Sequence, residues 1–313
     1  MRQGTKIKVL VTGSSGFIGL RVCRLLADMG HEVSGLDLRP GPAGMKTTIG
    51  DIANSATIAE AMQDVNAVVH LAAVVSVTAS ERDPGQTRAV NTDGAVAVTR
   101  AALERDARLL FVSSAAVYGH RSGGITETEP FVPAGVYGRS KLDAEERITQ
   151  LAEAMEGSIR IVRPFNVYGR GQTYRGGDSS LIAAVQRAIS EGAELTVRGD
   201  GFQTRDFIHV DDVAGAIVRR ILDDHADSRP VNIGTGVPRS VNDVLRIVEA
   251  ITGTKIRRLH GAQSESEINE SFADIRRLRA EDAKFDPAPL EKGLGDSFSW
   301  AVRGNGIDTS KAL

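Results

Sequence analysis

Three residues in the middle of the chain carry the side chains that a proton-transfer site requires. Tyr137 and Lys141 stand four residues apart, and residues with that spacing lie on one face of a helix. A free phenol has a pKa of about 10, so a tyrosine that acts as a base at pH 7 needs about 4 kcal/mol of added stabilisation of its phenolate. A nearby ammonium supplies such stabilisation. Ser114 can hold a substrate oxygen beside the phenol, and the three residues suit proton transfer at a carbinol.

A glycine-rich turn near the N-terminus offers a place for the second partner in such a reaction. The apolar run 7–11 predicts a buried parallel strand, and Gly13, Gly16 and Gly19 follow it before a helical pattern that ends at Gly30. Three glycines alone could be purely structural. In this strand–turn–helix context, however, the backbone amides can approach a pyrophosphate at the positive end of a helix. We therefore expect a dinucleotide here, with a nicotinamide that exchanges hydride.

An acidic residue ends the second predicted strand, 32–38. Asp37 stands 18 residues after Gly19, where a dinucleotide fold places a carboxylate on the adenosine ribose hydroxyls. A carboxylate there repels a 2′-phosphate, so NAD is favoured over NADP. Arg39 keeps NADP open as a secondary interpretation, and Asp37 could also simply begin the turn before Pro40.

Strand and helix patterns alternate through the first half of the chain. Buried strands are expected over 67–71 and 109–114, with a helix over 55–63 between the second and third strands of the series. Asn91 opens a helix that runs to about residue 104, where its simplest role is that of the N-cap. His70 is expected to be a core histidine. This alternation predicts an α/β fold with a doubly wound parallel sheet, and the length of 313 residues adds a smaller lobe.

Composition limits the partners and the location of the protein. The net charge of −2 offers no general attraction to nucleic acid or to an anionic membrane. No stretch approaches the roughly 18 apolar residues of a membrane span. Cys23 is the single cysteine, so we expect no disulfide framework, no metal site and a cytoplasmic location.

Taken together, these motifs resemble those of the extended short-chain dehydrogenases/reductases. The most similar branch is the NAD-dependent nucleotide-sugar epimerase/dehydratase family, and the resemblance covers nearly the whole chain. The motifs that carry it are Thr12-Gly-x-x-Gly-x-x-Gly19, Asp37, Leu71-Ala72-Ala73, Asn91, the run 113–119, Tyr137-x-x-x-Lys141, and the runs 163–169, 199–213 and 232–236.

The resemblance implies a set of cofactor-binding residues. Asp51 and Ile52 would lie at the adenine, Ala73 and Asn91 along the cofactor, and Pro164 behind the nicotinamide. The full set is Gly13, Gly16, Phe17, Ile18, Gly19, Asp37, Asp51, Ile52, Leu71, Ala72, Ala73, Asn91, Tyr137, Lys141 and Pro164.

The resemblance also implies a set of substrate-binding residues. Asn166 and Arg205 would meet a diphosphate, and a guanidinium fork does match phosphate oxygens, although Arg205 could instead pair with Asp206 or Asp211. Asn269 stands where many relatives have a second phosphate-binding arginine. The full set is Ser114, Tyr137, Asn166, Ser180, Leu181, Val197, Arg205 and Asn269.

The same resemblance implies a division of the chain. Residues 1–165 would form the NAD-binding Rossmann domain, to which 205–250 return, and 166–204 with 251–313 would form the substrate-binding lobe. The family usually dimerises through the 91–104 helix and the Tyr137 helix, so we expect a homodimer.

Two alanines separate the possible reactions. Dehydratases of this family carry Asp-Glu after the active-site hydroxyl residue, where this chain has Ala115 and Ala116. A dehydratase needs an acid to expel the hydroxyl as water, and alanine cannot donate a proton. We therefore expect a 4-epimerase acting on a nucleotide-diphosphate sugar, such as a UDP-hexose, a UDP-uronic acid or a UDP-N-acetylhexosamine. The alternatives are an NAD(P)H-dependent keto-sugar reductase, then a dehydratase or a non-catalytic dinucleotide sensor. Sugar, base and pathway stay open.

Overall fold

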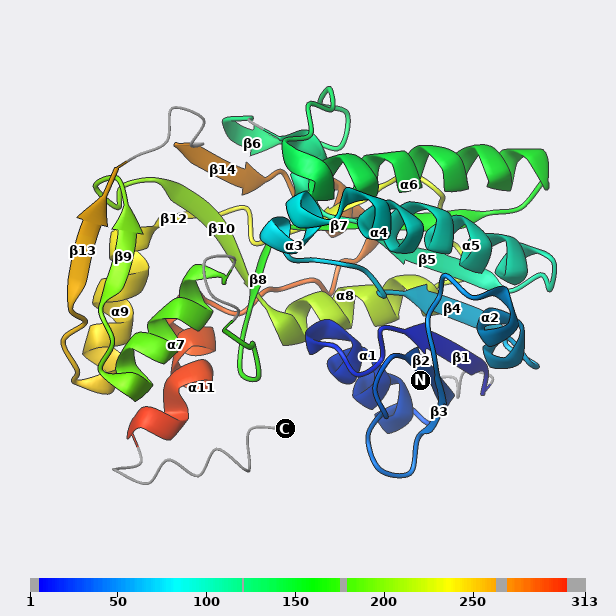
Figure 1. Cartoon of the computed structure of the whole chain (residues 1–313), viewed down its shortest axis with the longest axis horizontal. Helices are drawn as coiled ribbons and strands as arrows, with labels where there is room; N and C mark the ends of the chain where they lie inside the picture. Colours follow the sequence, from blue (N-terminus) through cyan, green and yellow to red (C-terminus); the bar gives the residue numbers. More distant parts are fainter. Residues whose placement is uncertain (1–5, 120, 175–178, 263–268, 303–313) are drawn as a thin grey trace.

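A seven-stranded parallel sheet forms the centre of the larger part of the molecule (Figure 1). The computed structural model describes residues 6–119, 121–174, 179–262 and 269–302. The predicted lobe end at 303–313 and the first five residues therefore lie outside the described residues. The strands, in their order across the sheet, are β11 (Val231–Ile233), β7 (Ile159–Pro164), β5 (Arg108–Val112), β4 (Ala67–His70), β1 (Lys8–Thr12), β2 (Glu32–Asp37) and β3 (Lys46–Ile49).

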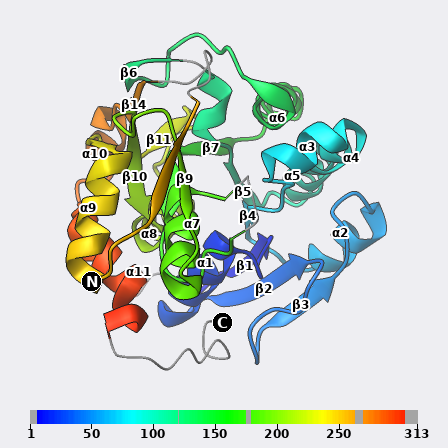
Figure 2. The same ribbon diagram turned by 60° about the vertical axis from the view of Figure 1, so that its left-hand side comes forward.

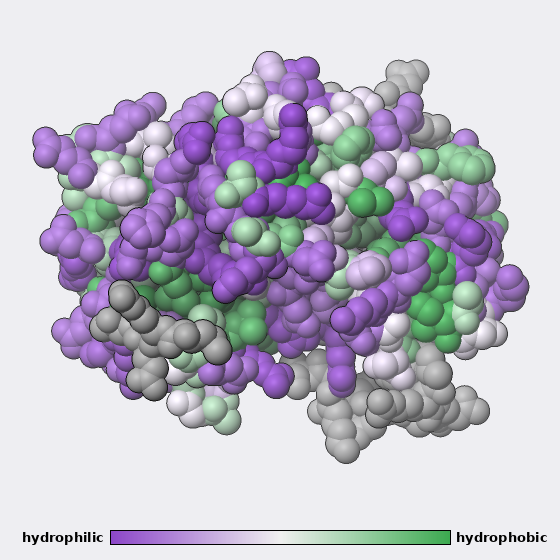
Figure 3. Space-filling view, turned by 180° about the vertical axis from the view of Figure 1, so that it is seen from behind, coloured by the Kyte–Doolittle hydropathy of each residue, from purple (hydrophilic) through white to green (hydrophobic). Residues whose placement is uncertain are grey.

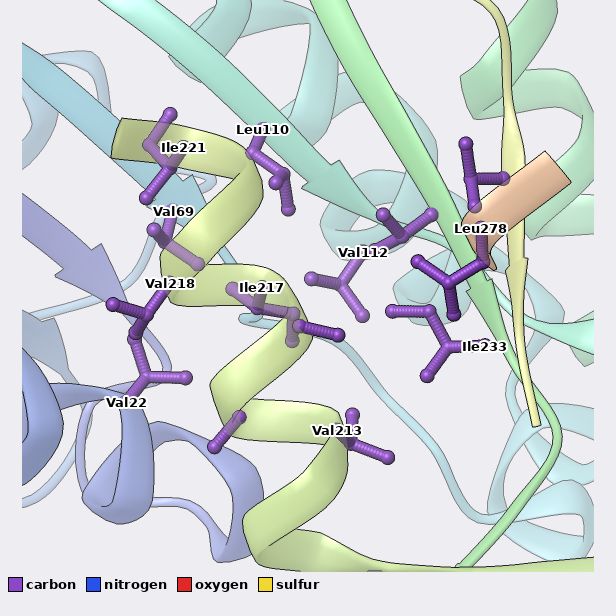
Figure 4. Close-up of a cluster of buried hydrophobic side chains, with 14 of the residues drawn as sticks. Val22, Val69, Leu110, Val112, Val213, Ile217, Val218, Ile221, Ile233 and Leu278 are labelled. Atoms are coloured by element: carbon purple, nitrogen blue, oxygen red, sulfur yellow. The ribbon is translucent and has the colours of Figure 1, made fainter. Parts of the chain in front are cut away.

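Helices cover both faces of this sheet, which explains why its central strands β1, β4 and β5 are nearly continuous apolar runs. Helices α1 (Phe17–Asp28) and α8 (Val210–Leu222) pack on one face. Figure 4 shows Val213, Ile217 and Ile221 of α8 directed at side chains of the sheet. The opposite face is covered by α2 (Ser55–Ala61), α5 (Ala95–Leu103) and α6 (Gly135–Ala154) (Figure 2). The predicted doubly wound fold is confirmed.

The strand order reverses beside β1, which lies between β2 and β4. In such sheets the crevice at the reversal, outside the carboxyl ends of the strands, is where ligands bind. Thr12 at the end of β1 pairs in register with His70 at the end of β4, and His70 pairs with Phe111 of β5. The turn after β1 and the segments after β4 and β5 therefore leave the sheet along one edge.

A short helical region connects β4 to α5. It consists of α3 (Val77–Arg82), α4 (Pro84–Arg88) and a π-helix (Ala89–Gly94), and a 3-10 turn (Ala115–Tyr118) follows β5. The expected N-cap role of Asn91 is wrong, because Asn91 lies inside the π-helix and its side chain has other partners.

The smaller part of the molecule lies to the left in Figure 1 and has its own core. It is built on a five-stranded sheet and a two-stranded sheet. The strands are β6 (Gly123–Ile125), β8 (Asn166–Tyr168), β10 (Thr204–His209), β12 (Pro238–Ser240), β14 (Glu270–Ala273), β9 (Leu195–Arg198) and β13 (Arg258–Gly261). The helices are α7 (Leu181–Glu191), α9 (Val241–Thr252) and α11 (Leu290–Val302), whereas α10 (Arg276–Glu281) contributes Leu278 to the core of the larger part.

The surface seen from behind is largely hydrophilic, with small separate hydrophobic areas (Figure 3). Within the described ranges, no helix has the length and apolar character needed to cross a membrane.

Candidate active site

The catalytic helix α6 brings Tyr137 and Lys141 to the carboxyl end of β5, where Ser114 follows the strand. Tyr137 is half-buried, and the Ser114 side chain lies near enough to its phenol to favour the phenolate. The Lys141 side chain is buried, and its Nζ donates to the Val112 carbonyl at 2.9 Å. The same ammonium lies 4.7 Å from the centre of the Phe111 ring. The predicted serine, tyrosine and lysine thus lie around one strand end.

Local contacts determine where α6 begins and how close it lies to this strand end. The Val136 N–H, in the first turn, donates to Glu81 Oε1 of α3 at 2.7 Å. A carboxylate is favourable at this end of a helix. Gly138 permits close packing, because a Cβ there would lie 2.8 Å from the Ala116 carbonyl oxygen. The phenol one residue before Gly138 is therefore held near the turn that carries Ser114.

Burial dominates the protonation of the tyrosine and the lysine. It raises the pKa of Tyr137 because desolvation disfavours the phenolate, and the Ser114 hydrogen bond opposes this in part. The expected net lowering of the Tyr137 pKa is thus not found in the protein alone. Burial also lowers the pKa of Lys141 to about 8, against the opposing charge of Glu145. Lys141 is therefore mostly an ammonium at neutral pH.

Asn91 fastens the segment after β4 to the catalytic helix. Its Oδ1 accepts from the Val74 N–H at 2.7 Å, and its Nδ2 donates to the Val74 carbonyl and to Ser140 Oγ, each at 3.0 Å. Asn91 is buried. It therefore supports the strand end on which Leu71, Ala72 and Ala73 lie.

His70 is a buried core histidine, as expected, and its protonation state follows from its neighbours. Its Nδ1 lies 2.6 Å from Thr12 Oγ1, and that oxygen accepts from the Leu71 and Ala72 N–H groups at 3.2 Å each. With these lone pairs in use, the Thr12 hydroxyl donates its hydrogen to Nδ1. Burial lowers the pKa of His70 to about 3, so the ring is neutral.

The turn after β1 has the backbone shape that a dinucleotide requires. Gly13 has φ 69°, and a Cβ there would lie 2.8 Å from the Ala72 nitrogen. A Cβ on Gly19 would overlap the Gly13 carbonyl oxygen. Helix α1 begins at Phe17 after Gly16, which provides no side-chain cap. The first N–H groups of α1, including those of Phe17 and Ile18, are thus left for a ligand such as a phosphate.

Acidic groups at the ends of β2 and β3 complete this fit. Asp37 accepts from the Ser15 N–H at 2.9 Å and from the Arg39 N–H at 3.0 Å, which fixes the carboxylate beside the glycine turn. Asp51 accepts from the Ala53 N–H, and Ile52 is buried. The glycine turn and these acidic groups therefore fit NAD. Pro164, predicted to lie behind the nicotinamide, is buried at the end of β7, in register with Ile233.

A cavity of about 650 Å³ lies in the smaller part of the molecule. Asn166, Ser180, Leu181, Val197 and Arg205, all predicted to bind substrate, line this one cavity. Among the residues that the structure describes, the catalytic three and Asn269 are not part of its lining. The Asn269 carbonyl accepts from the Thr204 N–H at 2.7 Å, so Asn269 lies next to the strand that carries Arg205.

Asp206 and Asp211, the two carboxylates that could have paired with Arg205, have other partners in the structure. Asp206 accepts from the Thr235 N–H and hydroxyl and from the N–H groups of Gly236 and Ala273. Asp211 pairs with Arg21 at 3.0 Å. Both carboxylates are thus accounted for by other groups.

The cavity also contains residues that the sequence did not indicate. Tyr174, Arg187 and Arg198 line it, and the Arg187 guanidinium lies 4.6 Å from the centre of the Tyr174 ring. Arg187 also donates to Glu191 at 2.7 Å. Tyr174 lies in an irregular loop with no motif around it, so no local signal could have identified it.

Comparisons with known proteins agree with this geometry. The model of the NAD dependent epimerase/dehydratase family matches residues 9–234. The UDP-glucose 4-epimerase of Mycolicibacterium smegmatis is 33% identical over 297 residues, which cover 89% of this chain and 91% of that protein.

Two solved structures have the same fold over their whole length. MoeE5 in complex with UDP-glucose and NAD is 30% identical, with a TM-score of 0.85, and the match covers 95% of this chain and 99% of that chain. UDP-glucuronic acid 4-epimerase from Bacillus cereus, in complex with UDP-glucuronic acid and NAD, is 26% identical, with the same TM-score and the same coverage. The family match, the glycine turn and the site built around Tyr137 lead to one conclusion: the chain belongs to the NAD-dependent epimerase/dehydratase family.

Proposed function

We propose that the protein is an NAD-dependent 4-epimerase of a nucleotide-diphosphate sugar. The observation that carries the proposal is the meeting of Tyr137, Ser114 and a buried Lys141 at the end of β5, on the edge of the sheet where the glycine turn also lies. The cavity lined by Asn166 and Arg205 supports a diphosphate substrate. NAD, which the glycine turn and Asp37 would hold, would supply the hydride acceptor and donor that epimerisation at C4 through a 4-keto sugar requires.

The residues of the chain transfer the proton and bind the substrate. Tyr137 removes the C4 hydroxyl proton and later gives it back. Ser114, which lies beside the phenol, holds the same oxygen as hydroxyl and then as ketone. Lys141 provides the positive charge that favours the phenolate. Arg205 holds the diphosphate, about which the keto sugar turns before it is reduced.

The 3-10 turn after Ser114 favours epimerisation over dehydration. Ala115 and Ala116 occupy this turn, both half-buried, and neither can protonate a leaving hydroxyl. Epimerisation releases no water and needs no such acid. The sugar is proposed to be a UDP-hexose, a UDP-uronic acid or a UDP-N-acetylhexosamine, which is consistent with the UDP-sugars bound by the similar solved structures.

The deciding experiment begins with protein purified without added cofactor. The protein is denatured, the released nucleotides are identified by mass spectrometry, and the enzyme is assayed against UDP-, dTDP- and GDP-sugars. Near-stoichiometric NAD or NADH, with interconversion of C4 epimers and no net redox change, is the expected result. An empty site, or retained NADPH with turnover of a keto sugar, would instead identify a reductase.

The proposal extends to assembly, location and organisation. A homodimer through α5 and α6 is expected from the resemblance and is tested by light scattering of the purified protein. A cytoplasmic location is consistent with a single, buried cysteine. We assign residues 1–165 and 205–250 to the cofactor-binding domain, and 166–204 with 251–313 to the substrate-binding lobe. The last part of the returning segment, 238–250, also contacts the lobe, because β12 pairs with β10 and α9 packs in the core of the lobe.

A further inference from the structure

A buried ion pair lies on the same face of α6 as the proposed catalytic lysine. Glu145 stands four residues after Lys141, and that spacing places the two side chains one above the other. Arg163 of β7 donates to both carboxylate oxygens of Glu145, with Nη2–Oε2 at 2.6 Å and Nε–Oε1 at 3.0 Å. Both side chains are at most 5% exposed. The contact is therefore bidentate and shielded from water.

The arginine of this pair is itself held from the far side. Its Nη1 donates to the Tyr118 hydroxyl at 2.8 Å and to the Glu127 carbonyl at 3.2 Å. Burial raises the pKa of Tyr118 to about 12, so the phenol keeps its hydrogen and donates it to Asn232 Oδ1 at 2.7 Å. The Glu145 carboxylate is thus fixed by a chain of contacts that runs from β7 through the 3-10 turn to β11.

Lys141 needs such a counter-charge because its other neighbours offer little. Its ammonium contacts the Val112 carbonyl and the Phe111 ring, and the His70 ring on β4 is neutral. Removing an ammonium from water without an opposite charge is costly. Burial lowers the pKa of Lys141 to about 8, and the Glu145 charge is what opposes this lowering.

We propose that Glu145 is a positioning residue that keeps Lys141 protonated beside Tyr137, and that Arg163 holds Glu145 in place for this role. The inference rests on the proposed function only in taking Lys141 as the ammonium that acts on Tyr137. Glu145 is buried and is not part of the lining of the cavity that holds Asn166 and Arg205, so its effect would reach the reaction through Lys141. No bond is made or broken by the pair.

Three variants and a control separate this role from a purely structural one. Glu145→Gln removes the carboxylate charge at nearly constant shape, and Arg163→Met removes the cation but leaves the carboxylate. The double variant removes both charges and is the one expected to fold if an unpaired buried charge unfolds the single variants. Glu146→Gln is the matched control, because it removes the same charge from the next, exposed position of the helix.

The first measurement is the titration of Lys141 in the protein without substrate. The chain has eight lysines, so 13Cε-lysine NMR can resolve them, and Lys141→Arg identifies the signal. Glu145→Gln is expected to move the titration midpoint down by about one pH unit, and the double variant to move it down less. Arg163→Met is expected to move it up, and Glu146→Gln to leave it in place.

The second measurement is the pH profile of turnover. In Glu145→Gln the alkaline limb is expected at lower pH, with turnover about fivefold lower at pH 8 and close to wild type at pH 6. If every folded variant titrates as the wild type does, while melting temperatures fall, the pair is only structural and the proposal is overturned. If the wild type does not epimerise any sugar nucleotide, the proposed function fails, but the NMR titration still decides the role of Glu145.

Discussion

The two parts of the molecule build their sites in different ways. In the larger part, the site consists of strand ends and a glycine turn, and its position follows from the register of a single parallel sheet, as between Thr12 and His70. In the smaller part, the cavity is lined by side chains from β8, α7, β9 and β10. A site made of backbone demands particular residue types, such as glycine at Gly13 and Gly19. A site made of side chains demands only an arrangement in space.

The proposed catalytic residues at the end of β5 give the most direct test of function. Tyr137→Phe is expected to lower kcat by about 10²- to 10⁴-fold, because the phenol is the group that moves the proton. NAD content measured after denaturation should stay at the wild-type level, since the glycine turn is untouched. Near wild-type turnover in this variant would falsify the assignment of Tyr137 as the proton carrier.

Most of the cofactor site in the larger part could be predicted from the sequence, because its signals lie within short stretches of the chain. The glycine spacing, Asp37 and the strand–helix alternation each follow from short-range rules of backbone geometry. The predicted N-cap role of Asn91 is wrong because the local sequence does not distinguish an asparagine inside a π-helix from one at the start of an α-helix. The Tyr137 pKa was misjudged because spacing shows the neighbouring lysine but not the burial of the phenol.

The substrate lobe was inferred less completely, because its contacts join distant segments. Arg205 and Asn166 were found through the family resemblance and do line the cavity. Tyr174 and Arg187 come together from a loop and a helix, and no periodicity links them. Nothing local in the sequence requires an aromatic residue there.

Replacing Arg205 should weaken substrate binding in the smaller part and leave NAD binding in the larger part unchanged. Arg205→Ala is expected to raise KM by roughly 10- to 100-fold, which corresponds to the 1.5–3 kcal/mol of charged hydrogen bonds to a diphosphate. Arg205→Lys should recover part of this loss, because it keeps the charge but not the fork. Steady-state kinetics and retained NAD are measured together. A loss of NAD in Arg205→Ala, with unchanged KM, would contradict the division of labour between the parts.

The core of the larger part should show a pH dependence that originates in His70. Its pKa is about 3 in the folded protein, below the ordinary value of 6.5. As the pH falls below 6.5, the unfolded chain binds a proton that the folded protein does not, so stability falls toward acid. Between pH 7 and pH 5 this amounts to about 2 kcal/mol.

His70→Asn tests this assignment, because the amide can still accept from Thr12 but does not titrate. Urea unfolding at pH 7 and pH 5 gives the loss of stability for each protein. The wild type should lose about 2 kcal/mol more than the variant over this range. Equal losses would show that another group causes the acid sensitivity.

The smallest expected effect concerns Tyr174, the lining residue that the sequence did not indicate. Its ring, backed by the Arg187 guanidinium, presents an aromatic surface in the cavity, and such contacts contribute about 0.5–1.5 kcal/mol. Tyr174→Ala should therefore raise KM and the Kd of free UDP about fivefold, with kcat unchanged, whereas Tyr174→Phe should bind as the wild type does. Phe202→Ala is the matched control, since Phe202 is 71% exposed and outside the cavity lining. If Tyr174→Ala and Phe202→Ala bind UDP equally well, the ring only closes the lobe, and the nucleotide is held by Arg205 and its neighbours alone.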